Sequence, residues 1–384
     1  MTGRERIARI LRREPADRVG LFEVFWLETA RRWAAEGRLG PGEGPNAPAA
    51  PASALRDTTR SIPVVEQAED HFRLDLRRCR ALNLVADLDA GEVVVEENET
   101  SRLVRDGNGA LLRWRKDASG APEHVDFLVK DRRGWEEHIR PRLLDRSRFD
   151  RRVDREYYRR MRTKCAAEGL FLTLGAVGAF DLMTPVCGHQ YALLGAMDDP
   201  RWIREMAGAY SRLTVELLEA LVAREGAPDG LWVWDDLGYR GRPFMSPDMY
   251  RDLLLPAHRR LFAWAHDRAL PVILHSDGFV EPLIPSLLEA GIDCLQPLEV
   301  KAGMDLPRIK RDFGDRLALI GGMDARALVS NDLGRVRREL EQKLPQAMAG
   351  GGYILQVDHS VPDQVEYETY RYFVETGLAI GAYQ

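Results

Sequence analysis

The sequence predicts an α/β fold: a (β/α)₈ TIM-type barrel with an N-terminal helical and loop extension and a β-hairpin insertion. Short runs that are apolar on both faces alternate with helical stretches, which is typical of a parallel sheet covered by helices on each side. Several of these runs end in acidic residues or histidine, as expected where barrel strands open into a shared pocket. A closed barrel is therefore favoured over an open doubly wound sheet.

The N-terminal part contains three predicted elements. Residues 2–13 form an amphipathic helix with apolar side chains on one face, and residues 19–25 form the first strand. Residues 37–54 contain four prolines and four glycines, so we expect a loop there. Since this loop precedes most of the barrel strands, it is interpreted as a candidate lid over the pocket and not as a domain linker.

The predicted insertion lies near residues 92–116. Apolar and polar residues alternate on both sides of Asp106-Gly107-Asn108-Gly109, whose residues readily take the positive φ values of a tight turn. This pattern predicts an antiparallel β-hairpin. The hairpin is an addition to the barrel, because its strands alternate in polarity whereas the barrel strands are apolar on both faces.

Seven barrel strands can be recognised in the sequence. They are predicted at residues 19–25, 171–178, 231–236, 272–277, 292–297, 317–323 and 353–359. An eighth is expected near residues 69–76, where no clean apolar run is visible. The length of 384 residues fits one barrel domain over residues 1–384, including the insertion. No G-x-G-x-x-G or Walker A motif is present, so the common nucleotide-binding folds have no support.

Composition excludes several classes of function. A formal charge of -5, from 55 basic and 60 acidic residues, gives no broad positive field for nucleic acid. The arginine pairs are predicted to lie on solvated helix faces; they are Arg77-Arg78, Arg132-Arg133, Arg151-Arg152 and Arg159-Arg160. The four widely spaced cysteines fit reduced thiols, and no signal peptide or membrane span is recognised, so a cytoplasmic protein is expected.

Polar residues gather where four predicted strands end. The ends are Trp234-Asp235-Asp236, His275-Ser276-Asp277, Gln296-Pro297-Leu298-Glu299 and Asp358-His359-Ser360. His275 and Asp277 stand two residues apart, so they project to the same side of an extended segment. Together with His359 they form the predicted metal-ligand set, and one acid could complete it, from Asp235, Asp236, Glu299 or Asp358. These imidazole and carboxylate donors suit zinc or another divalent ion. A single histidine at a strand end is usually structural, but four polar strand ends together favour a functional site.

Further residues are assigned provisional roles. Asp235, Asp236 and His359 are the predicted catalytic residues, because a carboxylate or imidazole can carry a proton to or from a substrate. A separate set is predicted to bind the substrate, and it consists of Trp26, Glu28, Phe180, Tyr239 and Glu299.

The chain resembles the uroporphyrinogen decarboxylase superfamily, which includes zinc-dependent corrinoid methyltransferases. The resemblance covers nearly the whole chain. Its most specific blocks are WDDLGYRGRPFMSPDMYRDLLLP, HSDGFVEPLIPSLLEAGIDCLQPLEVKAGMD and GGYILQVDHSVPDQVEYETYRYFV, which follow GAVGAFDLMTPVCG. The resemblance implies a (β/α)₈ barrel, an enzymatic activity on a small molecule and, as in other members, a homodimer.

The methyltransferase branch implies a metal site. Its zinc ligands are an H-x-C motif and a later cysteine; His275 matches the first ligand, Asp277 stands at the first cysteine and His359 at the second. Oxygen and nitrogen donors therefore replace sulfur, which also suits manganese or iron. The decarboxylase branch carries an arginine-rich element after the first strand, whereas this chain has FEVFWLETARRW there. Porphyrinogen carboxylates need arginine partners, so that branch fits less well.

Three functions remain open at this level. The first is a metal-dependent methyltransferase or related lyase that moves a methyl group between a small molecule and a corrinoid protein. The second is a metal-free decarboxylase of the uroporphyrinogen type, which uses Asp235 or Asp236 to stabilise a protonated ring and His359 to orient or protonate it. The third is a non-catalytic protein that binds a tetrapyrrole or corrinoid.

Overall fold

A parallel barrel sheet organises the structure, a computed structural model that describes residues 1–40, 62–116 and 122–383. Its eight strands follow the order β1-β14-β13-β12-β11-β8-β7-β2, with every paired neighbour parallel. The strands are β1 (Gly20–Leu21), β2 (Leu76–Cys79), β7 (Phe171–Val177), β8 (Gly230–Trp234), β11 (Val272–His275), β12 (Cys294–Gln296), β13 (Ala318–Ile320) and β14 (Tyr353–Leu355). The predicted (β/α)₈ fold is confirmed, and all seven recognised strands are present.

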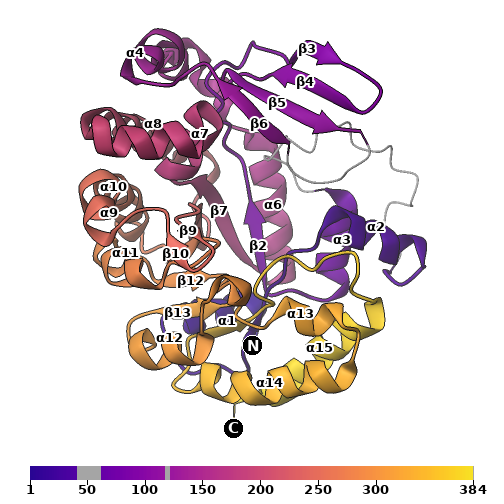
Figure 1. Cartoon of the computed structure of the whole chain (residues 1–384). Helices are drawn as coiled ribbons and strands as arrows, with labels where there is room; N and C mark the ends of the chain where they lie inside the picture. The colour runs from indigo at the N-terminus through magenta and orange to yellow at the C-terminus, as the bar shows by residue number, and fades with distance from the viewer. Residues whose placement is uncertain (41–61, 117–121, 384) are drawn as a thin grey trace.

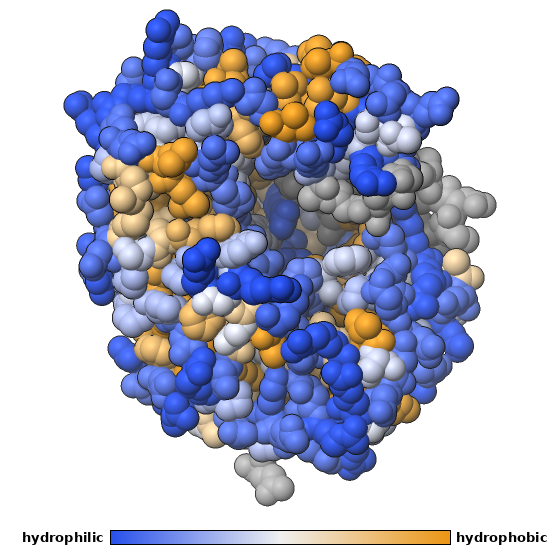
Figure 2. All heavy atoms as spheres, in the orientation of Figure 1, coloured by the Kyte–Doolittle hydropathy of each residue, from blue (hydrophilic) through white to orange (hydrophobic). Residues whose placement is uncertain are grey.

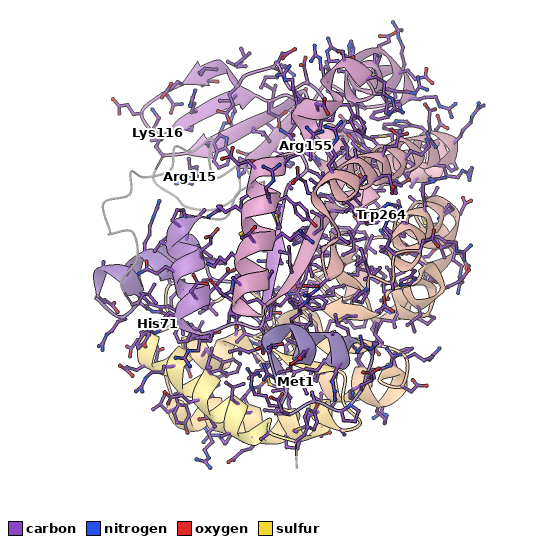
Figure 3. The ribbon with its side chains drawn as sticks, turned by 180° about the vertical axis from the view of Figure 1, so that it is seen from behind. Met1, His71, Arg115, Lys116, Arg155 and Trp264 are labelled. Carbon is purple, nitrogen blue, oxygen red and sulfur yellow. The ribbon has the colours of Figure 1, made fainter. Side chains whose placement is uncertain are left out.

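Helices cover the outside of the barrel (Figures 1 and 3). They are α1 (Gly3–Leu11), α2 (Leu27–Ala35), α3 (Pro63–His71), α4 (Arg132–Gly134), α5 (Arg140–Leu143), α6 (Arg155–Glu168), α7 (Ala179–Asp198), α8 (Pro200–Glu225), α9 (Pro247–Leu253), α10 (Leu255–His266), α11 (Ile284–Ala290), α12 (Leu306–Phe313), α13 (Ala325–Val329), α14 (Leu333–Met348) and α15 (Tyr367–Ile380). Shorter helical segments are Trp135–Ile139, Arg146–Arg152, Glu281–Leu283 and Val300–Ala302, and a small antiparallel pair is β9 (Gly238–Tyr239) with β10 (Arg242–Pro243).

The eighth strand lies slightly later than expected. Residues 69–71 form the last turn of α3, and the strand itself is β2. Its sequence, LRRC, contains Arg77 and Arg78, which hide the apolar pattern of a buried strand. The prediction that this arginine pair lies on a solvated helix face is wrong, because Arg77 is 2% exposed. Arg152 of another pair is also buried, with backbone carbonyls as partners.

The barrel closes between β1 and β2 without a regular ladder. The backbone N–H of Asp75 donates to the carbonyl of Leu21 at 2.9 Å, and the Asp75 carboxylate accepts the N–H of Leu21 at 2.8 Å. The same carboxylate accepts hydrogen bonds from Arg6 at 2.7 Å and from Arg18 at 2.8 Å. A buried ion cluster therefore joins α1, β1 and β2 at the amino end of the strands.

Helix α1 covers this end of the barrel, as the view from behind shows with Met1 beside it (Figure 3). Its N-cap Thr2 and Glu5 form a capping box, which satisfies backbone donors at the helix start. The apolar face of the helix contributes Ile7, Ile10 and Leu11 to the cluster of side chains inside the barrel. Since packed side chains fill the barrel interior at this end, the interior can open to a ligand only at the opposite end, where the strands finish.

The insertion is larger than the predicted hairpin. It is a four-stranded antiparallel sheet of β3 (Val93–Glu97), β4 (Ser101–Arg105), β5 (Ala110–Arg115) and β6 (Glu123–Phe127). The predicted turn is present between β4 and β5, where the N–H of Gly109 donates to the carbonyl of Asp106 at 2.9 Å. Most of the candidate lid at 37–54 lies outside the described residues. No helix in the described ranges is both long enough and apolar enough to cross a membrane.

Candidate active site

The carboxyl ends of the strands carry a cluster of acids and imidazoles. Trp234 ends β8 with its ring in the cluster inside the barrel, and Asp236 follows two residues later, just beyond the strand. Asp236, His275 and Asp277 each offer a ligand atom within 4.8 Å of the others. On the face seen in Figure 1, the surface is hollowed near its centre, below the inserted sheet (Figure 2). Acids and imidazoles grouped at a barrel mouth are typical of a catalytic or metal site.

The two histidines distant in sequence meet at Asp277. The Nε2 atom of His275 lies 3.7 Å from Asp277 Oδ2, and the Nε2 atom of His359 lies 3.9 Å from the same oxygen. Asp236 Oδ1 lies 3.5 Å from His275 Nε2 and accepts the backbone N–H of Asp277 at 2.9 Å. The structure therefore brings together all three residues of the predicted metal-ligand set and adds Asp236 to them.

Hydrogen bonds fix the orientation of the His275 ring. Its Nδ1 lies 2.5 Å from Oε1 of Gln296, the residue beside it on β12, and Gln296 Nε2 donates to Gln356 Oε1 at 2.9 Å. Because Gln296 Oε1 can only accept, Nδ1 carries the proton and Nε2 keeps a free lone pair toward the acids. An outer partner of this kind is what holds a metal-ligating histidine in place.

The donor set fits a divalent cation. Asp277 Oδ1 is a buried oxygen without a hydrogen-bond partner among the described residues, which is costly unless another group satisfies it. Burial raises the pKa of Asp277; His275 acts against this increase, and Asp236 adds to it. Two carboxylates and an imidazole are ligands that zinc, manganese and iron accept, and a cation would offset the repulsion between the acids.

The turn after β11 places Asp277 through tight backbone packing. Gly278 has φ +83°, and a Cβ atom there would lie 2.3 Å from the carbonyl carbon of Gly238. Only glycine fits such a position. The Gly278 N–H donates to Glu299 Oε2 at 2.7 Å, and Glu299 Oε1 lies 3.1 Å from the Lys301 ammonium. Glu299, a predicted substrate-binding residue, thus holds the turn that carries Asp277.

Asp235 points away from the mouth. It is fully buried, and its carboxylate accepts the N–H of Asp181 at 2.7 Å and contacts His258 Nε2 at 2.7 Å. Tyr250 lies 2.7 Å from the other ring nitrogen of His258. This chain of contacts leaves Asp235 to position the start of α7, so Asp236 is the acid of that pair that faces the pocket. Asp358 is similar, since its oxygens accept the N–H groups of Val300 and Ala325 at 2.8 Å.

Two polar residues of the mouth were missed by the sequence analysis. Asp181 follows the end of β7, and burial together with Asp236 and Asp235 raises its pKa well above the usual value. A search for polar residues after every predicted strand end would have identified Asp181. Burial lowers the pKa of His189, while Asp236 acts through space in the opposite direction. His189 lies within α7, where the sequence offers no reason to select it.

Aromatic side chains form one wall beside these residues. The ring of Phe244 lies 5.6 Å from Phe180, 5.7 Å from Tyr239 and 4.8 Å from His189, measured between centroids. The structure thus places the predicted residues Phe180 and Tyr239 both against the ring of Phe244. Trp26 is the N-cap of α2 and is 41% exposed. In the described part of the chain, neither Trp26 nor its neighbour Glu28 makes a hydrogen bond or ion pair with the acid and imidazole cluster.

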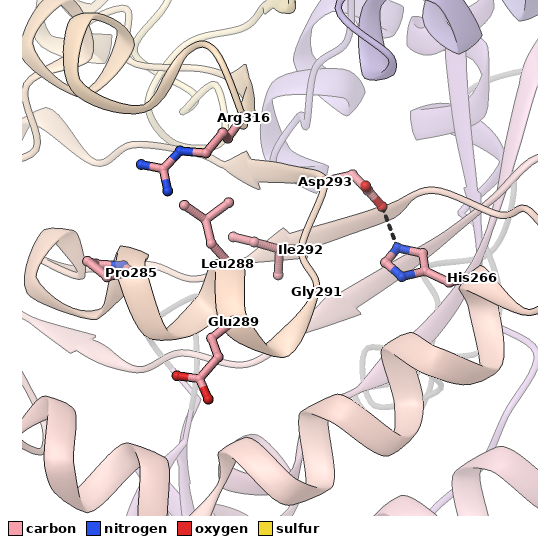
Figure 4. Close-up of a pocket in the computed structure, with 8 residues that line it drawn as sticks. All are labelled: His266, Pro285, Leu288, Glu289, Gly291, Ile292, Asp293 and Arg316. Carbon is pink, nitrogen blue, oxygen red and sulfur yellow. Dashed lines mark hydrogen bonds and ion pairs between the residues drawn. The ribbon is translucent and has the colours of Figure 1, made fainter.

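A second hollow lies at the opposite, amino end of the strands (Figure 4). Its lining includes His266 at the end of α10 and Asp293 just before β12, joined by a contact of 2.8 Å. The hydrogen bond with Asp293 raises the pKa of His266. Because this pair is on the stability face of the barrel, its role is to hold two elements together.

A (β/α)₈ barrel with clustered acids and imidazoles at its strand ends defines the class of protein. Sequence comparison identifies the family: the model of the uroporphyrinogen decarboxylase (URO-D) family matches residues 155–378, more than half of the chain. The chain belongs to the URO-D family. The match contains β7, β8, β11, β12, β13 and β14, and with them the whole acid and imidazole cluster.

Two similar proteins come from Methanosarcina mazei. A methylated-thiol--coenzyme M methyltransferase is 32% identical over 87 residues, which is 23% of this chain and 22% of that protein. The chain therefore aligns with about a fifth of the length of this relative. The solved structure of a methyltransferase superposes with a TM-score of 0.67 at 17% identity over 98% of both chains. At that identity the superposition shows a shared fold.

Proposed function

We propose that the protein is a metal-dependent methyltransferase that moves a methyl group between a small molecule and a corrinoid protein. The observation that carries the proposal is the convergence of Asp236, His275 and Asp277, with His359 facing the same carboxylate. The partial match to a methyltransferase supports methyl transfer as the type of reaction. The absence of an arginine element after the first strand argues against uroporphyrinogen as the substrate.

In this proposal His275, Asp277 and Asp236 hold a divalent ion such as zinc. The ion would supply Lewis-acid polarisation of the heteroatom from which the methyl group leaves or to which it is delivered. Gln296 keeps Nε2 of His275 directed at the site, and Glu299 keeps the Asp277 turn in place. His359 is left to move a proton at the substrate heteroatom, because its ring is 31% exposed toward the mouth.

Metal analysis of the purified protein tests the first step of this proposal. We expect the wild type to retain a stoichiometric divalent ion, and His275→Ala and Asp277→Asn to lose most of it. His266→Ala is the matched control, since it removes an imidazole at the other end of the barrel. Equal metal content in all four proteins would contradict the metal site. Conversion of uroporphyrinogen to coproporphyrinogen by the metal-free protein would contradict the methyltransferase assignment.

A further inference from the structure

Two arginines, one in β2 and one just after its end, point into the barrel mouth. Leu76 belongs to the cluster inside the barrel, so alternation along the strand places Arg78 and Arg80 on the same inward face. Contacts agree with this placement. The Arg78 guanidinium carbon lies 5.2 Å from the ring centroid of Trp232, and the Arg80 guanidinium carbon lies 3.8 Å from that of Trp234. Both arginines are half-buried.

Neither guanidinium has an acidic partner in the ranges 1–40, 62–116 and 122–383. No carboxylate of these ranges forms an ion pair with Arg78 or Arg80, and neither side chain donates a hydrogen bond to a protein oxygen there. Arg77, which points to the opposite face, shows the contrast: it donates to the Asp70 carboxylate at 3.0 Å and to two backbone carbonyls. Arginines without an acidic partner therefore occur on the inward face, at the mouth, whereas the outward-facing arginine is paired.

This arrangement places two like charges together without an ion-pair partner among the described residues. Burial lowers the pKa of Arg80 to about 9, and the charge of Arg78 adds to the decrease. Both groups nevertheless remain cationic at neutral pH. A buried charge without a partner is unfavourable, and an anion that enters the mouth removes that cost. Asp181 acts on Arg80 through space but forms no ion pair with it among the described residues.

The position of Arg80 over Trp234 also affects what it can bind. A guanidinium whose carbon lies over an indole ring, 3.8 Å from its centroid, uses the ring face and keeps N–H groups available at its edge. Those parallel donors match the two oxygens of a carboxylate. We propose that Arg78 and Arg80 bind the carboxylate of a small-molecule substrate at the barrel mouth.

The class of substrate is inferred from the acids and imidazoles on the opposite side of the pocket. Asp236 follows Trp234, the last residue of β8, by two positions, which spans about 7 Å in an extended segment. A small molecule with a carboxylate at one end can therefore reach the acid and imidazole cluster with its other end. Burial and the nearby charge of Asp236 raise the pKa values of Asp181 and Asp277, so negative charge is already unfavourable on this side of the pocket and a second carboxylate on the ligand is disfavoured there. That the far end bears the methyl group rests on the proposed function, whereas the carboxylate site does not.

Calorimetric titration of the full chain with a matched pair of ligands tests this site. The probes are 4-methoxybenzoate and its neutral amide, 4-methoxybenzamide, each with and without a metal chelator. We expect the carboxylate to bind and the amide to bind roughly tenfold to a hundredfold more weakly, as for the loss of one or two charged hydrogen bonds. Arg80→Gln should lower carboxylate affinity by a similar factor and leave amide affinity unchanged. Arg80→Lys should recover part of the loss.

Arg311→Gln is the control, because this arginine is exposed and pairs with Asp312 on the surface. Equal affinity for the acid and the amide would overturn the inference, as would full carboxylate binding by a folded Arg80→Gln. Absence of carboxylate binding to the wild type at millimolar concentration would also overturn it. Displacement of the benzoate by inorganic phosphate at lower concentration would overturn the carboxylate assignment. Carboxylate binding that survives the chelator is expected, and its loss would overturn the inference, because the metal would then be holding the carboxylate. Carboxylate binding by a wild-type protein that carries no metal as purified would contradict only the proposed function.

Discussion

The orientation of His275 depends on one neighbouring amide. Gln296 lies beside His275 in the register of β11 and β12, and it is 2% exposed. Its own orientation is set by Gln356, which is fully buried. A histidine held this way cannot rotate its Nε2 away from Asp236 and Asp277. The orientation of the His275 ring is thus set by Gln296, a residue that does not touch the proposed metal.

Replacement of that amide should weaken metal binding without removing a ligand. We expect Gln296→Leu to lower metal affinity by about 10- to 100-fold, the usual effect of losing the outer partner of a histidine ligand. Competition with a chromogenic chelator would measure the change. Gln346→Leu, on the exposed face of α14, is the control and should leave metal affinity unaltered. Identical affinities of the two variants would show that Gln296 does not orient the ligand.

Successive arginines on one strand have opposite roles. Arg77 points outward beneath α3, where Glu69 and Asp70 lie within 3.5 Å and 3.0 Å of its nitrogens. Arg78 points inward to the aromatic rings of the mouth. The residue type is the same, and the alternation of the strand determines whether the charge holds a helix or faces the barrel mouth.

At the scale of elements, a pair of side chains joins α10 to the start of β12. Asp293 Oδ2 accepts the backbone N–H of Val272 at 2.7 Å and lies 2.8 Å from His266 Nε2 (Figure 4). One carboxylate therefore links a helix end to the first residue of β11. Because His266 is 42% exposed, solvent screens the ionic part of this contact.

This pair should make stability depend on pH in one direction. The folded pKa of His266 is raised, chiefly by its hydrogen bond with Asp293. The stabilisation is thus fully present below the unfolded pKa of about 6.5 and is lost as pH rises through the folded pKa. Urea unfolding from about pH 5.5 to pH 8.5 should show the wild type exceeding His266→Gln by less than about 1 kcal/mol at the acidic end. That difference should shrink toward alkaline pH.

A control variant and a contrary outcome make this measurement specific to His266. His138→Gln removes an imidazole that is 40% exposed and far from β12 in sequence, and it should show no such trend relative to the wild type. A difference between wild type and His266→Gln that grows with pH would contradict the assignment, because it would require the neutral imidazole to be the stabilising form.

At the scale of the whole molecule, barrel closure depends on Asp75. This residue is 4% exposed and lies between Arg6 and Arg18 at the seam of β1 and β2. No other backbone hydrogen bond between β1 and β2 accompanies the one from Asp75 to Leu21 in the described chain. The ion cluster therefore joins β1 to β2, whereas the other neighbouring strands of the barrel are joined by ladders of backbone hydrogen bonds.

Removal of that carboxylate should destabilise the entire barrel. We expect Asp75→Ala to lower the free energy of unfolding by about 3–5 kcal/mol, because it leaves a buried Arg6 without one of its two acidic partners. Thermal and urea unfolding followed by circular dichroism would measure the loss. Asp315→Ala removes a carboxylate that is 77% exposed and should change stability by no more than about 0.5 kcal/mol. Equal stabilities would mean that the seam does not depend on Asp75.

The pattern of apolar runs in the sequence was sufficient to predict the barrel, because strands buried on both faces must be apolar throughout. It failed at β2, where Arg77 finds acids on α3 and Arg78 finds aromatic rings inside the barrel. Neither partner is local in sequence. The hairpin turn at Asp106 was predicted because turn chemistry is local, whereas its extension to four strands depends on β3 and β6, which pair with the outer edges of β4 and β5.

The sequence by itself determined the fold class, the strand ends and the residue types that converge there. Only the tertiary structure decided which member of each pair faces the pocket: Asp236 rather than Asp235, and Arg78 rather than Arg77. It also decided that His275 and His359 share one carboxylate. The reason is that side-chain direction follows from the registration of strands across a closed sheet, which depends on contacts between residues far apart in the chain.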